Sequence, residues 1–448
     1  MLRKIFNLLL LLSTLLWFAP FFSFTSTTAW MTTAPMPSVA FTQSTTVVDY
    51  TTDGKSLGYP DSRKIARDSK GNLYIAYRKK YSMIGKSCYH IFVAKSADNG
   101  LTWTVVNHNQ PIETTGDYTQ RVPSITLDAQ DGLHVVWYGL DAQHRSENER
   151  QIKYINSPDG GVTWRPWQNI AAVLGYTGEA MWQEHPVIYA DTQHRLFVAW
   201  EGGDGQHTNG QIKFSQSLDG GQRWSAWMNV APAVDAYFSR PTLVATHDGS
   251  VLYLLAYAKS QGLTQIVWTQ SADSGNTWAT WLPVAPVQQD QRHVSLAIDQ
   301  NNRLHAVWQQ QTDPLWGDTT SQVYYAYYTE GVWSRAEYPA ANPALHQLFP
   351  SLATTLQGQV WVTWQAVPTA RSDSLEEMIA GTVYYTVKSG SRWQAPTILG
   401  HSNQAFYPSL GTSRYTPQVA PDIVWLEAGQ ASADSTYAIR VATGIIGQ

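Results

Sequence analysis

The sequence predicts an all-β fold, a β-propeller of four-stranded antiparallel blades, from two internal repeats and a high content of tryptophan. The chain of 448 residues holds 20 Trp, enough to supply a large aromatic core. The first repeat is a phrase of the form Ser-x-Asp-x-Gly-x-Thr-Trp, with Arg in place of Thr in one copy. Its aspartates, spaced by 61, 60 and 54 residues, are Asp98, Asp159, Asp219 and Asp273. One supersecondary unit therefore recurs along the chain, as in a radial array.

The second repeat counts the units. It reads Pro-Ser-Leu or a close variant, then a polar turn, then an alternating run that ends in Trp or Tyr. Its seven copies span residues 65–77, 123–137, 186–200, 241–257, 294–308, 350–364 and 408–425. The period-2 alternation predicts two strands joined by a hairpin, and a third and fourth strand flank each Asp-containing turn. We expect seven blades, with six as the alternative.

The end of the chain indicates how the ring closes. The seventh unit stops after its third strand, near residues 437–446, whereas the β-prone segment Thr45–Tyr50 precedes the first unit. That segment is expected to supply the missing outer strand. Because no linker-like stretch interrupts residues 45–448, they are interpreted as a single propeller domain, preceded by an N-terminal segment, residues 30–44. The Trp that closes each phrase is expected to pack against the sheet of its own unit.

The first 29 residues read as an export signal. Arg3 and Lys4 precede an apolar run over residues 5–24, and Thr27–Ala29 offers a cleavage site. The alternative is an uncleaved membrane anchor. The only cysteine, Cys88, cannot form an internal disulfide. These features predict a secreted or cell-surface protein that touches a membrane only if residues 1–29 stay uncleaved.

Composition narrows the class of partner. The formal net charge is −4 and no basic stripe is present, which argues against nucleic acid. Since no His, Cys or Asp cluster has metal-ligand spacing, we expect no catalytic metal and no cofactor, although a structural Ca²⁺ on a loop is left open. The chain is expected to be a monomer that binds a glycan or polysaccharide of acidic character.

The phase of the second repeat locates the working face. In each blade the first strand begins, and the second ends, on the face opposite the hairpins and the Asp-containing turns. The two residues that stand four and three positions before the Leu or Ile of each copy crowd around the axis. These pairs are Asp61-Ser62, Arg121-Val122, Glu184-His185, Ser239-Arg240, Arg292-His293, Leu348-Phe349 and Phe406-Tyr407. Three arginines thus converge on one mouth, which predicts a site for an acidic ligand. The alternative is a structural ion-pair network in which Asp61 and Glu184 neutralise the arginines.

The Ser-x-Asp-x-Gly-x-Thr-Trp phrases resemble the Asp-boxes, or BNR repeats, of the sialidase superfamily. The resemblance implies that Arg121, Arg240 and Arg292 bind a substrate carboxylate. It implies further that Tyr407 is the nucleophile, Glu184 or Glu201 its partner glutamate, and Asp141 or Glu147 the acid/base. Sialidases, however, have six blades and carry the first arginine in the first blade, where this chain has Asp61-Ser-Arg-Lys-Ile65.

Three classes of function are therefore open. The first is an exported, sialidase-like glycoside hydrolase that acts on sialic-acid-type or other acidic glycans. The second is a non-catalytic propeller that binds glycan or protein at the cell surface. The third is an acidic-polysaccharide lyase, a class known on seven-bladed propellers, in which Arg neutralises a uronate while His185, His293 or Tyr407 moves protons.

Overall fold

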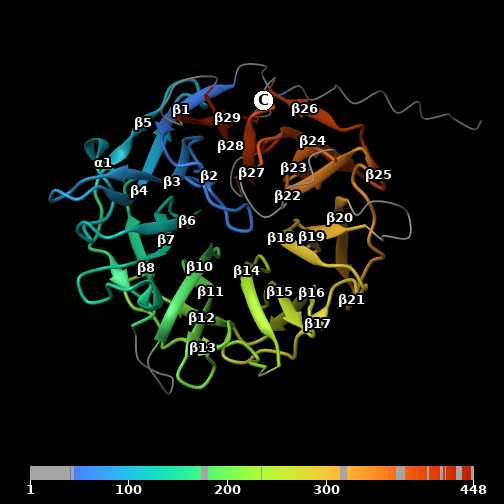
Figure 1. The fold of residues 1–448 in the computed structure, drawn as a ribbon, viewed down its shortest axis with the longest axis horizontal. Coiled ribbons are helices and arrows are strands. Elements are labelled where there is room, and N and C mark those ends of the chain that lie inside the picture. Colours follow the sequence, from blue (N-terminus) through green and yellow to red (C-terminus); the bar gives the residue numbers. More distant parts are fainter. Residues whose placement is uncertain are drawn as a thin grey trace, which may run out of the picture. The chain divides into compact units, whose positions relative to one another are not determined.

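Seven four-stranded units surround one axis in the computed structural model (Figure 1). The structure describes residues 41, 45–172, 180–233, 235–312, 320–369, 379–400, 403–413, 417–418, 420–429 and 436–444. The prediction of a seven-bladed, nearly all-β propeller is confirmed. Among these residues no helix is long and apolar enough to cross a membrane.

Each blade runs from an inner strand at the axis to a short outer strand at the rim. The strands of blades 1 to 3 are β2 (Ile65–Arg67), β3 (Leu73–Tyr81), β4 (Cys88–Ser96), β5 (Thr104–Val105), β6 (Gln120–Leu127), β7 (Leu133–Gly139), β8 (Gln151–Ser157), β9 (Gln168–Asn169), β10 (Ala180–Ala190), β11 (Leu196–Asp204), β12 (Gln211–Ser217) and β13 (Met228–Asn229). Those of blades 4 and 5 are β14 (Tyr237–Ala245), β15 (Leu252–Ser260), β16 (Leu263–Ser271), β17 (Leu282–Pro283), β18 (Gln291–Ile298), β19 (Leu304–Gln311), β20 (Ser321–Thr329) and β21 (Val332–Trp333). Those of blades 6 and 7 are β22 (Leu345–Thr354), β23 (Val360–Pro368), β24 (Thr382–Ser389), β25 (Arg392–Trp393), β26 (Thr397–Leu399), β27 (Ala405–Gly411), β28 (Asp422–Ala428), β29 (Tyr437–Ala442) and β1 (Thr46–Thr51).

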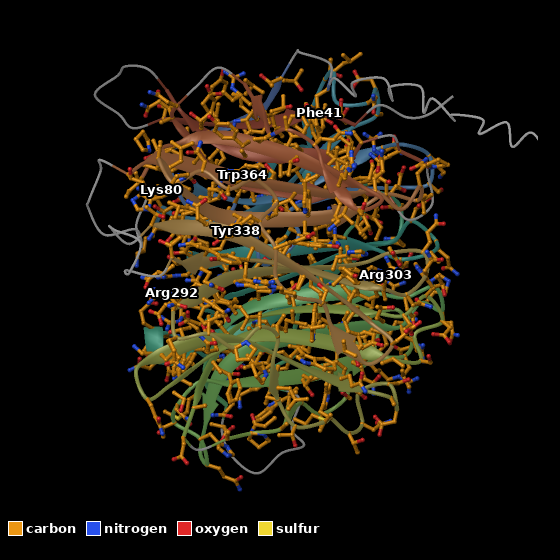
Figure 2. All side chains as sticks on the ribbon, turned by 90° about the vertical axis from the view of Figure 1, so that its right-hand side faces the viewer. Phe41, Lys80, Arg292, Arg303, Tyr338 and Trp364 are labelled. Carbon is orange, nitrogen blue, oxygen red and sulfur yellow. The ribbon has the colours of Figure 1, made fainter. Side chains whose placement is uncertain are left out.

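The middle strands are buried on both faces because each blade packs between two neighbours. Every residue of β7, β8 and β11 is buried, and Trp137 and Trp200 are fully enclosed. In the described part of the chain, helical structure is limited to the turn α1 (Val106–Asn109) and the 3-10 turn η1 (Glu147–Glu149). The two ends of the ring are called here the strand-entry face, where inner strands begin, and the Asp-box face, where the hairpins and Asp-containing turns lie. Figure 2 shows the ring from the side, with Arg292 and Arg303 at opposite faces.

The ring closes as the sequence predicts. β1 is the outer strand of blade 7 and pairs antiparallel with β29, with Thr46 opposite Val441 and Thr51 opposite Tyr437. In Figure 1, β1 in blue lies beside the red strands of the same blade. The seventh sheet therefore contains strands from both ends of the propeller, and the edge of β29 is covered rather than open.

The Asp-containing turns are held by a repeated set of hydrogen bonds. In the first, Asp98 accepts bonds from the Ser96 hydroxyl (2.7 Å), the Thr102 amide (2.9 Å) and the Thr102 hydroxyl (2.5 Å). Gly100 has φ of 85°, the left-handed conformation that the turn requires. The same bonds recur around Asp159 and Asp273, so these residues are scaffold.

Four of the Trp that close these turns also contact the neighbouring blade, in addition to the packing expected from the sequence. Each of the four lies edge-on or steeply inclined against an aromatic ring on the third strand of the preceding blade. The pairs, with centroid separations, are Trp224–Tyr154 (4.9 Å), Trp278–Phe214 (5.2 Å), Trp333–Trp268 (6.0 Å) and Trp393–Tyr325 (5.1 Å). These side chains therefore join blades together as well as filling them.

Phe41 occupies the corresponding position for blade 7. That blade has no Asp-containing turn, because its outer strand comes from the other end of the chain. Phe41 precedes β1, is 5% exposed, and packs against Tyr385 on the third strand of blade 6 at 4.9 Å and against Trp361 at 5.7 Å. Residues that precede the first blade in the sequence thus supply both the outer strand β1 and the aromatic contact of Phe41 for the last blade.

The turns predict how stability depends on pH. The hydroxyl groups of Thr102 and Thr277, with backbone amides, lower the pKa of Asp98 and of Asp273 to about 2. Because the folded-state pKa lies below the unfolded value near 3.9, this stabilisation is present above about pH 4 and is lost as the pH falls through 2. We expect the urea midpoint to fall over this range, and to fall less in the double variant Asp98→Asn/Asp273→Asn. The exposed Asp235→Asn is the control, and equal slopes for all three proteins would contradict the assignment.

Candidate functional site

A ring of β-bulges forms the strand-entry mouth. The inner strands of blades 2 to 7 each break register at the predicted pair of residues. The second residue of each pair has positive φ: Val122 (40°), His185 (48°), Arg240 (48°), His293 (53°), Phe349 (53°) and Tyr407 (51°). For non-glycine residues this conformation costs on the order of 1–3 kcal/mol and is typical of functional sites. A bulge redirects a side chain, and here it does so at the equivalent position of six inner strands.

Side chains of the preceding blade stabilise three of these bulges. The residue that follows the closing aromatic of each second strand reaches across to accept a bond from the bulge amide. The pairs are Arg240 N to Glu201 Oε2 (2.7 Å), Phe349 N to Gln309 Oε1 (3.3 Å) and Tyr407 N to Gln365 Oε1 (3.2 Å). Each strained amide is therefore satisfied without backbone pairing.

Blade 1 contributes a loop instead of a bulge. This axial loop, residues 52–64, lies between β1 and β2 and reaches the middle of the ring (Figure 1). Its Tyr59 ring lies 5.5 Å from His293, 5.9 Å from Phe349 and 5.4 Å from Tyr407. The Arg240 guanidinium stacks over Tyr59 at 3.6 Å, a cation–π contact. Tyr59 thus joins rings and charges from four other blades at the axis.

The axial loop is held in place by contacts with blades 1 and 2. Arg78 binds Asp53 at 2.5 Å, and its carbonyl accepts a bond from Ser56. The fully buried Lys64 ammonium binds the Ser62 hydroxyl (2.5 Å) and the Pro123 carbonyl (2.7 Å). Burial lowers the pKa of Lys64 to about 7, although the charge of Asp61 opposes the shift. Asp61 itself lines a small void of about 20 Å³ beneath the loop, not the cavity above it.

A cavity of about 170 Å³ lies at the mouth, beside Tyr59. The described residues that line it include four cations, three tyrosines and one histidine. They are Lys55, Gly58, Tyr59, Arg78, Arg121, Val122, Tyr138, His185, Arg240 and Tyr407. No Asp or Glu is among them. The cavity is therefore suited to an anionic ligand.

Two of the three predicted arginines line this cavity, and the third does not. The Nη1 nitrogen of Arg240 is buried and has no hydrogen-bond partner among the described residues. Arg121 is one-third exposed and binds Glu147 at 3.0 Å. Arg292 lies on the same face, but it pairs with Asp290 at 3.5 Å and is not a lining residue. Arg78, which the sequence analysis did not single out, lines the cavity in its place.

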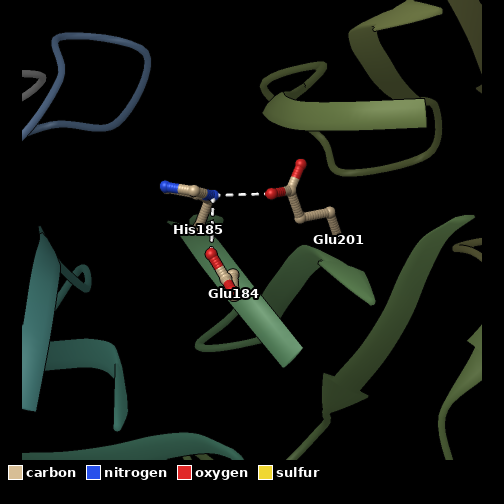
Figure 3. Close-up of side chains that lie close together, drawn as sticks. All are labelled: Glu184, His185 and Glu201. Carbon is tan, nitrogen blue, oxygen red and sulfur yellow. Dashed lines mark hydrogen bonds and ion pairs between the residues drawn. The ribbon is translucent and has the colours of Figure 1, made fainter. Parts of the chain in front are cut away.

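The predicted carboxylates form a chain of alternating charge beside the cavity. Glu147 binds Arg150 at 2.5 Å, and Arg150 in turn binds Glu184. His185 Nδ1 lies 3.8 Å from Glu184 and 2.7 Å from Glu201. Figure 3 shows Glu184, His185 and Glu201, with the other ring nitrogen of His185 directed away from both carboxylates. The network that the sequence analysis kept as an alternative is thus present, built with Arg150 and Glu147 as well as Glu184.

Electrostatics fix the charge states of this cluster. Burial alone would raise the pKa of Glu201, but His185, Ser239 and Arg240 outweigh it and the pKa is lowered. Burial, reinforced by Arg240 and Arg292, holds the pKa of His293 well below its usual value. Burial raises the pKa of Tyr138, so its hydroxyl keeps its proton at neutral pH. Near neutrality Glu201 is therefore charged, and His293 and Tyr138 are neutral.

Asp141 lies outside the cavity. It is buried and binds Lys153 at 3.2 Å and His144 at 3.0 Å. The same arrangement recurs in the next blade, where Asp204 binds Lys213 at 2.6 Å and His207 at 3.2 Å. A motif repeated in two blades indicates a scaffold for the loop after the second strand.

Three potential metal ligands meet at this site although they lack metal-ligand spacing in the sequence. One ligand atom each of Glu184, His185 and Glu201 lies within 4.8 Å of the others. Their oxygens, however, already accept bonds from Arg150, His185 and the Arg240 amide. A cation would have to displace these donors and approach two arginines, so the donor set fits a salt-bridge network better than a metal.

The sequence analysis missed Tyr59, Arg78 and Tyr138. A signal for two of them exists: Arg78 and Tyr138 each follow the aromatic residue that ends a second strand, the position that Glu201 holds in blade 3. That position forms a second ring at the mouth. Tyr59 belongs to no repeat and carries no comparable signal.

Comparison with known proteins agrees with this architecture. Residues 20–177 match a family described as BNR repeat-containing. No curated protein matches the sequence. Among solved structures, the polysaccharide lyase Uly1 is 10% identical, with a TM-score of 0.50 over 92% of this chain and 94% of that one. An α-L-arabinofuranosidase of Fusarium graminearum is 14% identical (TM-score 0.46, 72% and 92% covered). A Trypanosoma rangeli sialidase is 10% identical (TM-score 0.48, 86% and 54% covered).

A closed ring of seven blades with Asp-containing turns makes this chain a β-propeller with its candidate site at the strand-entry mouth. The match of residues 20–177 to a BNR repeat-containing family agrees with the resemblance of these turns to the Asp-boxes of the sialidase superfamily.

Proposed function

We propose that this protein binds an acidic glycan at the strand-entry mouth and cleaves it by β-elimination, as a polysaccharide lyase does. The observation that carries the proposal is the lining of the cavity, which combines cations, tyrosines and a histidine with no carboxylate. Elimination from a uronate needs a cation to neutralise the carboxylate, a base and an acid. Hydrolysis of a glycoside, in contrast, generally needs carboxyl groups at the reacting bond.

Arg240 and Arg121 receive the substrate carboxylate. The unsatisfied Nη1 of Arg240 supplies a buried donor, and Arg121 faces the same cavity from blade 2. Neutralisation of the carboxylate makes the neighbouring C5 proton more acidic, because the negative charge that develops there is stabilised by the guanidinium groups. Tyr59 holds the Arg240 plane in place by stacking.

His185 is the base. Its Nδ1 lies 2.7 Å from Glu201, and when this nitrogen carries the proton of the neutral ring, Nε2 has the free electron pair. His185 Nε2 takes the C5 proton, the C5–H electron pair forms the C4=C5 double bond, and the C4–O4 bond breaks. Tyr138, whose ring lies 5.3 Å from that of His185, gives its proton to the departing oxygen. One proton is taken and one is given, so the step balances.

A second candidate is hydrolysis of a sialic-acid-type glycoside with Tyr407 as nucleophile. The observation in its favour is that Tyr407 lines the same cavity as Arg121 and Arg240. Against it, the implied partner residues Glu184, Glu201, Asp141 and Glu147 lie outside the lining. A binding platform without catalysis is the third possibility, and the same assay separates all three.

The test incubates the purified protein with polygalacturonate, alginate, hyaluronan and a fluorogenic α-sialoside. If the reaction is elimination, at least one polyuronate should give a product whose C4=C5 double bond absorbs in the ultraviolet. This absorbance should not appear with the His185→Ala variant. Fluorophore release that is lost in Tyr407→Phe would overturn the proposal in favour of hydrolysis. Binding to a polyuronate without any product would leave a platform, and also contradicts the proposed chemistry.

Glu147 offers a prediction about affinity. Its exposed carboxylate binds Arg121 at 3.0 Å and so competes with a substrate carboxylate for that cation. Exposed ion pairs contribute about 0.2–1 kcal/mol, so Glu147→Gln is expected to lower KM by about two- to fivefold with kcat little changed. Glu330→Gln, an exposed change on blade 5, is the matched control. A KM that rises in Glu147→Gln would show that the carboxylate assists binding.

We propose further that the protein is exported through residues 1–29 and works as a monomer outside the cytoplasm. The support is the order of basic, apolar and small residues in that segment. N-terminal sequencing of the protein from its producing cells tests this directly. A mature start near residue 30 is expected, and an intact Met1 would favour the membrane anchor. Light scattering of the purified chain tests the monomer.

A further inference from the structure

A polar cleft lies on the Asp-box face, which is the face opposite the mouth. It lies between blades 2 and 3, has a volume of about 270 Å³, and is thus larger than the cavity at the axis. Its walls come from the hairpin and the Asp-containing turn of both blades. The side chains that matter are Asp128, His134, Asn156, Arg165, His194 and Asp219.

Part of this lining is scaffold. Asp128 binds His134 Nε2 at 3.1 Å, and His134 Nδ1 binds the Tyr154 hydroxyl at 2.7 Å. Blade 5 repeats this relay with Asp299, His305 and Tyr325, at 3.2 Å and 2.7 Å. Because the relay recurs in blade 5, it belongs to the repeat and does not by itself indicate a ligand.

The remaining groups vary from blade to blade. The blades can be aligned by a backbone hydrogen bond that both contain. Arg165 N donates to Asn156 O in blade 2, and Ser334 N donates to Tyr327 O in blade 5. Blade 5 therefore has Tyr327 in place of Asn156 and Ser334 in place of Arg165. His194, with φ of 62°, corresponds to Gly358 in the hairpin of blade 6, with φ of 76°. The cleft therefore has three polar side chains that the repeat itself does not require.

Asn156 is the strongest indication of a ligand. The residue is 5% exposed, lines the cleft, and its side-chain amide has no hydrogen-bond partner among the described residues. The amide atoms open onto the cleft, where water or a ligand can satisfy them. Arg165, which is exposed, forms no ion pair in the described part of the chain and adds further donors at the cleft edge.

The charges of the cleft select a neutral ligand. Asp128 is already engaged by His134 and, at 3.4 Å, by His194, and Asp219 by Arg223 at 2.9 Å. An anion would meet these two carboxylates, and a cation would meet Arg165. Hydroxyl groups both donate and accept, so adjacent hydroxyls of a sugar match the paired donor and acceptor of an amide.

We infer that this interblade cleft is a second binding site, which takes a neutral sugar unit through Asn156, Arg165 and His194. It lies on the face opposite the proposed catalytic mouth. It therefore anchors a glycan without taking part in cleavage, and it does not depend on the chemistry at the mouth.

Saturation-transfer NMR on the full chain tests this inference. The probes are the methyl glycosides of glucose, galactose, mannose, xylose, arabinose and rhamnose, with methyl glucuronoside as the charged comparison. We expect transfer to at least one neutral glycoside. In Asn156→Ala the transfer should fall by about fivefold or more, because one or two hydrogen bonds are lost. Arg165→Ala, at an exposed residue, repeats the test in a variant whose fold is not at risk.

Two controls separate this site from the mouth and from the surface. Arg240→Ala, which disables the mouth, should leave transfer to the neutral glycoside unchanged, and so should Arg303→Ala at the equivalent relay of blade 5. Transfer that survives in both Asn156→Ala and Arg165→Ala overturns the inference, as does transfer to none of the six neutral glycosides, since the cleft then holds only water. Loss in Arg240→Ala alone assigns the binding to the mouth and also overturns it.

Discussion

Replacement of Arg240 by alanine is expected to lower kcat/KM on an acidic glycan by about 10²- to 10³-fold, the loss typical of a donor that stabilises developing charge. The guanidinium stacks on Tyr59 at 3.6 Å and presents a buried nitrogen with no hydrogen-bond partner among the described residues. Burial alone would lower the pKa of Arg240, but nearby groups that include Tyr257 and Asp61 outweigh it, and the pKa is raised. The guanidinium is therefore charged, and its Nη1 nitrogen can donate to an anionic ligand.

The matched control is Arg292→Ala. Arg292 comes from the same position on the neighbouring inner strand but pairs with Asp290 and does not line the cavity. We expect its loss to change kcat/KM by less than about fivefold, the scale of an exposed ion pair. Arg240→Lys should recover only part of the activity, because an ammonium cannot reproduce the planar fork. Equal damage from Arg292→Ala and Arg240→Ala would restore the three-arginine site, and a thermal midpoint for each variant distinguishes lost chemistry from lost fold.

Replacement of Phe41 by alanine is expected to lower the free energy of unfolding by about 3 kcal/mol, at the lower end of Phe-to-Ala changes in protein cores. Phe41 is 5% exposed and is packed between Trp361 and Tyr385, where the other blades use the Trp of an Asp-box. Its loss leaves a cavity at the seam between blades 6 and 7. β1 depends on this seam to remain paired with β29.

Two further variants make the Phe41 prediction specific. Tyr50→Ala, an exposed position on β1, should leave the urea midpoint almost unchanged. Phe41→Trp restores the residue that the other blades use at this place and should retain most of the stability. If Phe41→Ala and Tyr50→Ala have the same midpoint, the aromatic contact of Phe41 contributes nothing and the closure depends on strand pairing alone.

The ring itself could be predicted because its parts repeat. Seven copies of one phrase fix the number of blades, and the incomplete last copy indicates that Thr45–Tyr50 completes it. The same phase brings Arg121, Arg240, His185 and Tyr407 to one mouth, since inner strands must begin close together around an axis. These predictions follow from backbone periodicity, which the sequence reports directly.

The details of the mouth could not be predicted for physical reasons. Left-handed φ at His185, Arg240 and Tyr407 is imposed by packing and by bonds from the preceding blade, and no Gly or Asn announces it. The axial loop that carries Tyr59 occurs once, so no repeat places it. Which carboxylate meets which arginine depends on side-chain paths from loops of unequal length, as in the pairing of Arg121 with Glu147 rather than Glu184.

The pairing of β1 with β29 constrains the order of events during synthesis. Thr46 and its partner Val441 are nearly 400 residues apart. At roughly 5–20 residues per second, a ribosome completes β29 some 20–80 s after β1 has been made. Between the synthesis of β1 and that of β29, β1 is an unpaired, β-prone segment. Blades 1 to 6 can assemble during this time in the order of translation. The final blade forms only after β29 has been made, so a product that stops before β29 leaves β1 without its partner strand.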